Sequence, residues 1–348
     1  MLLAELVATS EACAATRART QKIALLADAI RQFAPDEVSV GVGYLAGQPR
    51  QERLEVGWAA LSGAAAEPAA EPSLHILDVD AALEVIASDA GAGSRTRRLD
   101  ALAALLGRAT AEEQRWLRAL ISRDLRQGAL AGIVVQAIAR AASVPEAAVR
   151  RATMLCADLG AVAAAALARG EDGLGEFGLE LFQPLEPMLA QTASDVGAAI
   201  EQLGRAAIEA KLDGARIQVH RDGGRVAIYT RNLRDVTARM PEVVALVRDM
   251  PAQRLVLDGE VVAHRPDGRP QPFQVTMSRF GRDHEDPVVE RATMWPAFFD
   301  CLHVDGEDLL DRPLDERAAA LERVVPTELR VDRLVVDSSD AARAFEAA

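Results

Sequence analysis

Residues 209–230 read Glu-Ala-Lys-Leu-Asp-Gly-Ala-Arg-Ile-Gln-Val-His-Arg-Asp-Gly-Gly-Arg-Val-Ala-Ile-Tyr-Thr. Apolar side chains alternate with others on both sides of the tripeptide Asp222-Gly223-Gly224. A period of two is that of a strand, and Gly-rich pairs between two alternating runs favour tight turns. The stretch therefore predicts a β-hairpin that begins near Ala215 and ends at Thr230.

Alternating or apolar runs continue downstream of this hairpin. Residues 254–264 and 296–303 are further predicted strands, and residues 313–325 have the spacing of an amphipathic helix. Another helix is predicted to start near Ser339. The hairpins predict a mixed α/β domain with a largely antiparallel sheet.

The first 170 residues have a different pattern, in which Leu, Ala, Val and Ile recur every three or four positions. Thr110-Ala-Glu-Glu113 has the form of a capping box, which predicts a helix that starts there and that Gly128 ends. Ser143-Val-Pro145 predicts the start of another helix, which runs to Leu155. This region is predicted to be an all-α domain.

The length of 348 residues fits about two domains, each with a core of its own. Residues 171–183 are rich in Gly and Glu and are predicted to be an exposed linker. The predicted organisation is a helical domain over residues 1–170, that linker, and a mixed domain over residues 184–348. The fold class is thus multi-domain, all-α followed by α+β.

Charge is distributed unevenly between the two halves. The formal net charge is −13, of which residues 1–170 carry −1 and residues 171–348 carry −12. Basic residues in the first half are almost all Arg. A nearly neutral, Arg-rich domain can still present a basic face to phosphates.

Three cysteines, Cys13, Cys156 and Cys301, lie far apart and form no C-x-x-C pair. This spacing excludes a zinc ribbon and indicates a reducing compartment. The first residues lack the basic start of a secretory signal, and Glu5 interrupts their apolar run. The sequence contains no apolar run of the ~18 residues that span a bilayer. A soluble, cytoplasmic protein is expected.

Lysine is nearly absent, since the chain has 37 Arg but only Lys22 and Lys211. The guanidinium of Arg, with a pKa above ~12, does not lose its proton to become a nucleophile, whereas a lysine amine does so when its surroundings lower its pKa. Lys211 stands in Lys-Leu-Asp213-Gly214-Ala-Arg216, beside two charged residues. It is therefore the candidate nucleophile.

These residues resemble the adenylation motif of ATP-dependent DNA ligases, a family of covalent nucleotidyltransferases. Further segments are similar to that family's motifs in the same order: Pro184-Leu-Glu-Pro187, Thr230-Arg231-Asn232, Leu257-Asp258-Gly259-Glu260 and Phe298-Phe299-Asp300. The helical first half is similar to the DNA-binding domain that precedes the catalytic domain in larger ligases.

The resemblance implies ATP and Mg²⁺ as cofactors and gives six residues a role. Lys211 would form a lysyl-AMP phosphoramidate, and Arg216 would neutralise phosphates. Glu209 would recognise the adenine through its carbonyl, and Phe299 would stack on the adenine. Arg231 would contact the ribose of AMP or a DNA phosphate, and Glu260 would bind a ribose hydroxyl or the magnesium ion.

The implied reaction seals nicks in duplex DNA, and the enzyme is expected to be a monomer. AMP would move to the 5′-phosphate at the nick, and the 3′-hydroxyl would then displace it. The candidates for DNA contact in the first domain are two groups: Arg95, Arg97 and Arg98 in one loop, and Arg126 and Gly128 in a Gly-containing turn. Helix amino termini and such turns bind phosphates without reading sequence.

The family pattern normally continues to a second metal-binding Glu, two lysine motifs and an OB-fold, and none of these follows Phe299. The expectation is therefore a fragment that is incomplete at its C-terminus, adenylates itself poorly and does not seal nicks. Alternatives are an NAD-dependent ligase, an RNA ligase, a capping guanylyltransferase, or a non-catalytic DNA-binding scaffold.

Overall fold

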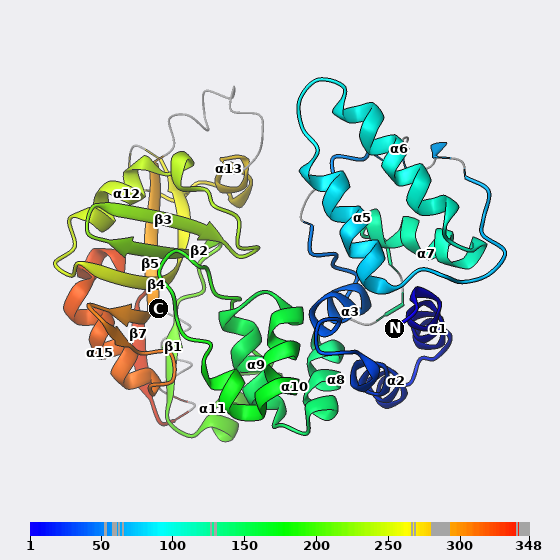
Figure 1. Cartoon of the computed structure of the whole chain (residues 1–348). Coiled ribbons are helices and arrows are strands. Elements are labelled where there is room, and N and C mark those ends of the chain that lie inside the picture. Colours follow the sequence, from blue (N-terminus) through cyan, green and yellow to red (C-terminus); the bar gives the residue numbers. More distant parts are fainter. Residues whose placement is uncertain are drawn as a thin grey trace. The chain divides into compact units, whose positions relative to one another are not determined.

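The structure is a computed structural model that describes residues 1–340 except 52–53, 58–60, 62, 65, 126, 129–130, 266, 268, 280–292 and 339 (Figure 1). The chain divides into two compact units, Met1–Gly178 and Leu179–Ala348. Residues 171–175 differ from the predicted exposed linker, because they form a short helical segment after a kink at Gly170 and Leu174 is buried.

The first unit is built of helices around an aliphatic core. Their bounds are α1 (Leu3–Ala15), α2 (Arg19–Gln32), α3 (Val38–Leu45), α5 (Ile76–Ser88), α6 (Ser94–Gly107), α7 (Ala111–Ile121), α8 (Ala131–Ala142), α9 (Glu146–Leu155) and α10 (Leu159–Gly175). Leu6, Leu26, Leu83 and Leu117, from four of these helices, are fully buried in one cluster. The helical prediction for the first half is confirmed.

The two predicted helix starts in this unit are confirmed, but the predicted end of α7 is wrong. The hydroxyl of Thr110 accepts a hydrogen bond from the backbone N–H of Glu113, whose carboxylate accepts one from the N–H of Thr110. The helix then ends at Ile121, and Arg123 has a positive φ of 56°. The chain therefore turns several residues before Gly128.

The second unit is mixed. Its elements are α11 (Val196–Leu203), β1 (Ala206–Glu209), β2 (Ala215–Asp222), β3 (Arg225–Thr230), α12 (Pro241–Arg248), β4 (Arg254–His264), α13 (Phe273–Ser278), β5 (Thr293–Val304), β6 (Glu307–Asp308), α15 (Leu314–Val324) and β7 (Arg333–Val336), with short 3₁₀ turns at Thr237–Arg239 and Thr327–Leu329. The predicted hairpin, strands and helix up to Val325 are confirmed. The helix predicted from Ser339 lies almost entirely outside the described residues.

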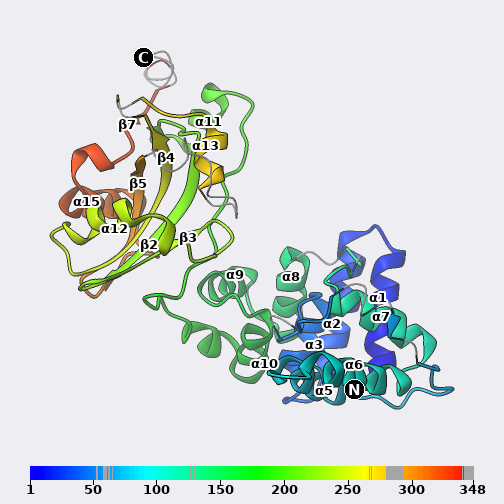
Figure 2. The same ribbon diagram turned by 90° about the horizontal axis from the view of Figure 1, so that it is seen from above.

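The main sheet has five antiparallel strands in the order β3-β2-β4-β5-β6. Residues 223 and 224 form a two-residue turn between β2 and β3, and Gly223 has the positive φ of 55° that such a turn requires. Figure 2 shows α12 and α15 on one side of the sheet and α13 on the other. A separate ribbon pairs β1 with β7.

Alternation along the central strands separates a core face from a polar face. Ile217 and Val219 of β2, and Leu257 and Val261 of β4, are fully buried in the core that α12 and α15 cover. The residues between them point to the opposite face, because successive side chains of a strand alternate. That second face carries Arg216 and the carboxylates of β4.

On this polar face the side chain of His220 binds the backbone at Phe182, near the start of the second unit. Its ring is fully buried, Nδ1 accepts a hydrogen bond from the backbone N–H of Phe182 at 2.9 Å, and Nε2 lies 2.8 Å from Oε1 of Gln218. The hydroxyl of Tyr229 donates to the carbonyl of Phe182 at 2.9 Å. Because Nδ1 accepts, this arrangement needs the neutral imidazole.

Acidification is expected to weaken the second unit through His220. Burial, reinforced by nearby His303, lowers the pKa of His220 to about 4 from its ordinary 6.5. The unfolded chain thus takes up the proton first, so the contribution of His220 is complete above pH 6.5 and is lost as the pH falls towards 4. Between pH 7.5 and pH 5 the free energy of unfolding should fall by about 2 kcal/mol from this group.

Urea unfolding of the wild type and of His220→Gln at both pH values measures this effect. The Gln variant does not titrate here, so its loss on acidification should be smaller by that amount even if its stability at neutral pH is lower. Equal losses in the two proteins would show that His220 is not the group responsible.

Candidate active site

Strands β2 and β4 bring charged residues together on the polar face of the sheet. In their antiparallel register Arg216 lies opposite Glu260, and Gln218 lies opposite Asp258. Opposite residues in such a pair point to the same face, about 5 Å apart. Residues 44 and 40 positions apart in the sequence therefore become neighbours.

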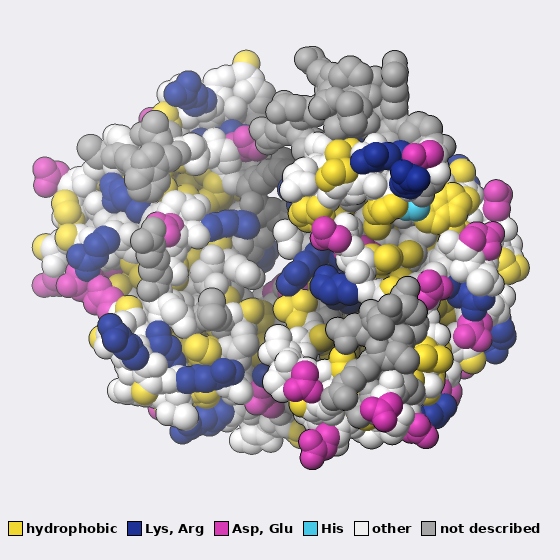
Figure 3. All heavy atoms as spheres, turned by 180° about the vertical axis from the view of Figure 1, so that it is seen from behind, with side chains coloured by type: hydrophobic (Ala, Val, Ile, Leu, Met, Phe, Trp, Pro, Cys, Tyr) yellow, Lys and Arg dark blue, Asp and Glu magenta, His cyan; other side chains and the backbone are white. Residues whose placement is uncertain are grey.

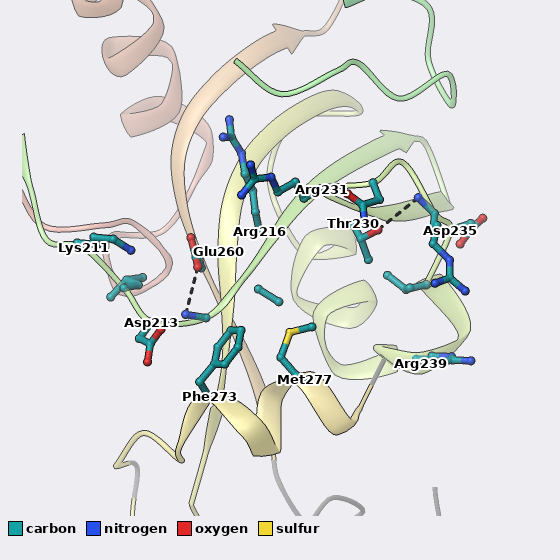
Figure 4. Close-up of a pocket in the computed structure, with 16 residues that line it drawn as sticks. Lys211, Asp213, Arg216, Thr230, Arg231, Asp235, Arg239, Glu260, Phe273 and Met277 are labelled. Atoms are coloured by element: carbon teal, nitrogen blue, oxygen red, sulfur yellow. Dashed lines mark hydrogen bonds between the residues drawn. The ribbon is translucent and has the colours of Figure 1, made fainter. Parts of the chain in front are cut away.

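A cavity of about 620 Å³ opens beside these strands (Figure 4). Four of the six predicted nucleotide-site residues line it: Lys211, Arg216, Arg231 and Glu260. The rest of the lining comes from Leu212, Asp213, Gly214, Ala215, Thr230, Asn232, Arg234, Asp235, Val236, Arg239, Phe273 and Met277. Lys211 is exposed and makes no hydrogen bond or ion pair with any described residue. Its amine is therefore accessible to a molecule in the cavity.

Gly214 explains why the lysine motif contains a glycine. A Cβ atom at this position would lie 2.4 Å from the carbonyl oxygen of Val261 and 2.8 Å from Cγ of Glu260. The backbone N–H of Gly214 donates to Oε1 of Glu260 at 3.1 Å. The loop that carries Lys211 is thereby held closely against β4.

Arg216 is held by a two-point ion pair rather than left free. Its Nε and Nη2 donate to the two carboxylate oxygens of Asp258 at 3.1 and 2.6 Å, and its Nη1 donates to the carbonyl of Met188 at 3.1 Å. The hydrogen bond to Asp258 raises the pKa of Arg216. Burial raises the pKa of Asp258, although the guanidinium opposes this rise. The result is a fixed cation at the edge of the cavity.

Glu260 is half-buried, and its surroundings pull its pKa in two directions. Burial is the larger influence and raises the pKa of the carboxyl, while the N–H of Gly214 and the charges of Lys211 and Arg216 lower it. A cation that arrived at the carboxylate would favour its ionised form. Glu260 is therefore a carboxylate suited to a hydroxyl or cation ligand.

Glu209 and Phe299 are not among the residues that line this cavity. Glu209 lies at the end of β1 and Phe299 in β5. The Phe299 ring is nevertheless linked to the cavity, because its centroid lies 5.5 Å from the guanidinium carbon of Arg216. The six predicted residues thus form two adjoining groups that meet at Arg216.

Sequence reasoning did not single out Asp258, Phe273 and Met277. Asp258 precedes Glu260 by two positions on an alternating strand, so the period alone could have placed it on the same face. Phe273 and Met277 are four residues apart on α13, and Figure 4 shows both bordering the cavity. Buried Thr276 fixes α13 by accepting a hydrogen bond from the N–H of Ala263 at 3.0 Å.

The candidates for DNA contact in the first unit differ in their surroundings. Arg95, Arg97 and Arg98 lie in the first turns of α6, so their prediction as loop residues is wrong. Arg97 forms an ion pair with Asp89, and Arg98 donates to the carbonyl of Asp89, so both order the loop before α6. Arg95 is exposed. Arg126 lies outside the described residues.

Gly128 has a φ of 68° and lies in a turn that a buried lysine supports. The amine of Lys22 donates to the carbonyl of Gln127 at 2.7 Å, and a Cβ at Gly128 would come within 2.6 Å of that amine. The second lysine of the chain thus has a structural partner.

Among the described residues, no three His, Cys, Asp or Glu side chains gather into a metal site. In the same part of the chain, no helix is both long and apolar enough to cross a membrane.

Comparison with known proteins identifies relatives along the whole chain. Residues 187–348 match the family model for an ATP dependent DNA ligase domain, and residues 59–139 match the model for a DNA ligase N terminus. A "Probable DNA ligase" of Anaeromyxobacter sp. (strain Fw109-5) is 52% identical over 99% of this chain and 67% of its own length. One of Streptomyces griseus is 50% identical over 100% of this chain and 68% of its own length.

The chain therefore spans about two thirds of the length of these relatives. Among solved structures, a mycobacterial DNA ligase D complexed with ATP and MES shares 26% identity over 41% of this chain and 44% of its own, with a TM-score of 0.31. Several families of enzymes share the K-x-D-G motif. Among them, the family model that matches this chain is the one for ATP-dependent DNA ligases. With half of its residues identical to those of curated DNA ligases over its full length, the chain belongs to the ATP-dependent DNA ligase family.

Proposed function

We propose that Lys211 is the nucleophile of this ligase and that the cavity beside β2 and β4 receives ATP. The supporting observation is the convergence of an exposed lysine, a fixed arginine and a half-buried carboxylate in one cavity of about 620 Å³. A cavity of this size suits a ligand as large as a nucleotide.

In the proposed first step the lone pair of Lys211 Nζ attacks the α-phosphorus of ATP. A P–N bond forms, the bond from the α-phosphorus to the bridging oxygen breaks, and pyrophosphate leaves. The amine proton goes to solvent. In the next steps AMP passes to the 5′-phosphate of a nick, the 3′-hydroxyl attacks that phosphate, and AMP is released.

The fixed charges around Lys211 are suited to this chemistry. Arg216 cannot swing away from the cavity, because Asp258 and the carbonyl of Met188 hold its guanidinium. A preorganised cation stabilises charge on a transferring phosphoryl group without reorganising during the reaction. Arg231 is exposed at the cavity wall and is proposed to contact the ribose or a DNA phosphate.

Magnesium is part of the proposal, with Glu260 as its protein ligand. A single carboxylate fits this ion, because Mg²⁺ is usually held by one or two carboxylates together with substrate phosphates and water. When bound, the ion would reduce the negative charge of the phosphates that Lys211 approaches. Glu260 already accepts the N–H of Gly214 through Oε1, so Oε2 is the atom proposed to bind it.

The proposal extends to the DNA substrate, the oligomeric state and the cellular location of the protein. We propose a nicked duplex as the substrate, with the first unit contacting its backbone; Lys and Arg side chains gather over that unit at the lower left of Figure 3. The candidates Arg95, Arg97, Arg98, Arg126 and Gly128 remain predictions. A monomeric enzyme and a cytoplasmic location are also proposed, the latter because all three cysteines are unpaired.

Covalent labelling tests the proposed function. Incubation with ATP labelled at the α-phosphate and Mg²⁺ should attach one label to Lys211, whereas ATP labelled at the γ-phosphate should attach none. EDTA should abolish the labelling. Absence of any α-label after prolonged incubation with Mg²⁺ would refute the proposed reaction, and full labelling in EDTA would refute the role of the metal.

A further inference from the structure

The ribbon of β1 and β7 includes Glu209, which precedes Lys211 by two residues in the sequence. In its antiparallel register Glu209 lies opposite Arg333. The pairing continues past the strand, because the N–H of Ala210 donates to the carbonyl of Asp332 at 3.2 Å. The backbone before the proposed nucleophile is thus fixed by the last described strand of the chain.

The side chain of Arg333 joins this ribbon to β5. Its Nε donates to Oε1 of Glu209 at 2.7 Å, and its Nη2 donates to the carbonyl of Phe299. Only 15% of the Arg333 side chain and 34% of the Glu209 side chain are exposed. One guanidinium therefore contacts both nucleotide-site residues that do not line the Lys211 cavity.

The backbone next to Arg333 is anchored to the same strand. The N–H of Val331 donates to the carbonyl of Phe298 at 3.0 Å. Both Nε and Nη2 of Arg333 approach Oε1 of Glu209, and Oε2 makes no hydrogen bond with any described residue. Arg333 thus sets the separation between Glu209 and Phe299 while it leaves one carboxylate oxygen available as an acceptor.

We propose that Arg333 is a positioning residue that sets the base selectivity of the site. The inference rests on the proposed function and on the adenine contacts that the family resemblance implies for Glu209 and Phe299. For Glu209 the proposed acceptor of the adenine amino group is the Oε2 atom of its carboxylate, in place of its carbonyl. A hydrogen-bonding edge and a stacking ring discriminate between bases only when they are held at one spacing, and the planar fork of Arg suits this task. The amino group of adenine donates to a fixed acceptor, whereas guanine presents a carbonyl oxygen at that position.

Equilibrium binding of ATP and of GTP, each measured by calorimetry in EDTA so that no transfer occurs, tests this inference. Arg333→Ala should raise the Kd for ATP about tenfold, which is the effect of losing one charged hydrogen bond. The Kd for GTP should stay within about twofold of its wild-type value. Arg333→Lys keeps the charge without the fork and should lie between Arg333→Ala and the wild type. Arg254→Ala is the matched control, since it breaks an exposed Arg–Asp ion pair, with Asp222, in the five-stranded sheet.

The selectivity ratio separates positioning from folding. A general loss of structure weakens both nucleotides together, so an unchanged ratio of the two Kd values in Arg333→Ala would overturn the inference. If the Ala variant does not fold, the ratio in Arg333→Lys decides in the same way. A wild type that neither binds ATP nor becomes labelled at Lys211 would instead refute the proposed function, and the inference with it.

Discussion

Chains with Lys211→Ala or Lys211→Arg are expected to form no covalent adduct with AMP under conditions in which the wild type does. The Ala variant lacks the nucleophile. The Arg variant keeps the positive charge, but a guanidinium with a pKa above ~12 has no free lone pair at neutral pH. Loss of a nucleophile typically lowers a rate by about 10⁴-fold or more. Intact-mass measurement after incubation with ATP and Mg²⁺ checks this prediction.

Binding of ATP should survive these substitutions, because Arg216, Arg231 and Glu260 remain in the cavity. With Lys211 replaced, Lys22 is the only lysine left, so a residual lysyl-AMP could form only there. Lys22 is 9% exposed and its amine donates to the carbonyl of Gln127, which makes it a poor substitute. An AMP adduct on the Arg variant at the wild-type rate would rule out Lys211 as the nucleophile.

Local patterns in the sequence were sufficient to predict the elements that carry the site. The bounds of β4 match those predicted, because its apolar pattern lies within one strand. The capping box that opens α7 is likewise complete within four residues. Features that depend on neighbours three or four residues away were therefore predicted well.

Errors arose where tertiary contacts override composition. Residues 171–175 have the composition of a polar linker, yet they are helical after a kink at Gly170, and Leu174 is buried in the core of the first unit. Gly128 was assigned to the end of α7, but its positive φ serves a turn against Lys22. Composition alone does not show which side chain fills the adjacent space.

Contacts between segments that lie far apart in the sequence could not be predicted from these patterns either. The family motifs associated Glu209 and Phe299 with Lys211. They contained no information about Arg333, which lies 124 residues after Glu209. Asp258 was visible as part of a motif, whereas its two hydrogen bonds to Arg216 depend on the register of β2 against β4. Sheet register is set by the whole core rather than by either strand.

Asp258→Ala should have a large effect on both stability and adenylation. Asp258 and Arg216 are 10% and 25% exposed at their side chains, so removal of the carboxylate leaves a largely buried guanidinium without its partner. Breaking such a pair costs about 3–5 kcal/mol of the free energy of unfolding. Without Asp258 the guanidinium of Arg216 is no longer held in one position. Loss of a fixed electrostatic contact typically lowers the rate of the catalysed step, here adenylation, about 10²–10³-fold. Urea unfolding and the initial rate of labelling measure the two effects.

The double variant Arg216→Met, Asp258→Leu distinguishes catalysis from stability. Apolar side chains of similar volume can replace a buried ion pair with little cost, so its free energy of unfolding should return to within about 1 kcal/mol of the wild type. Its labelling rate should stay low, because no cation stands beside the phosphates. If the double variant recovers both stability and labelling, then Arg216 and Asp258 serve the fold alone. If Asp258→Ala keeps the wild-type labelling rate, the fixed position of Arg216 is not needed for the reaction.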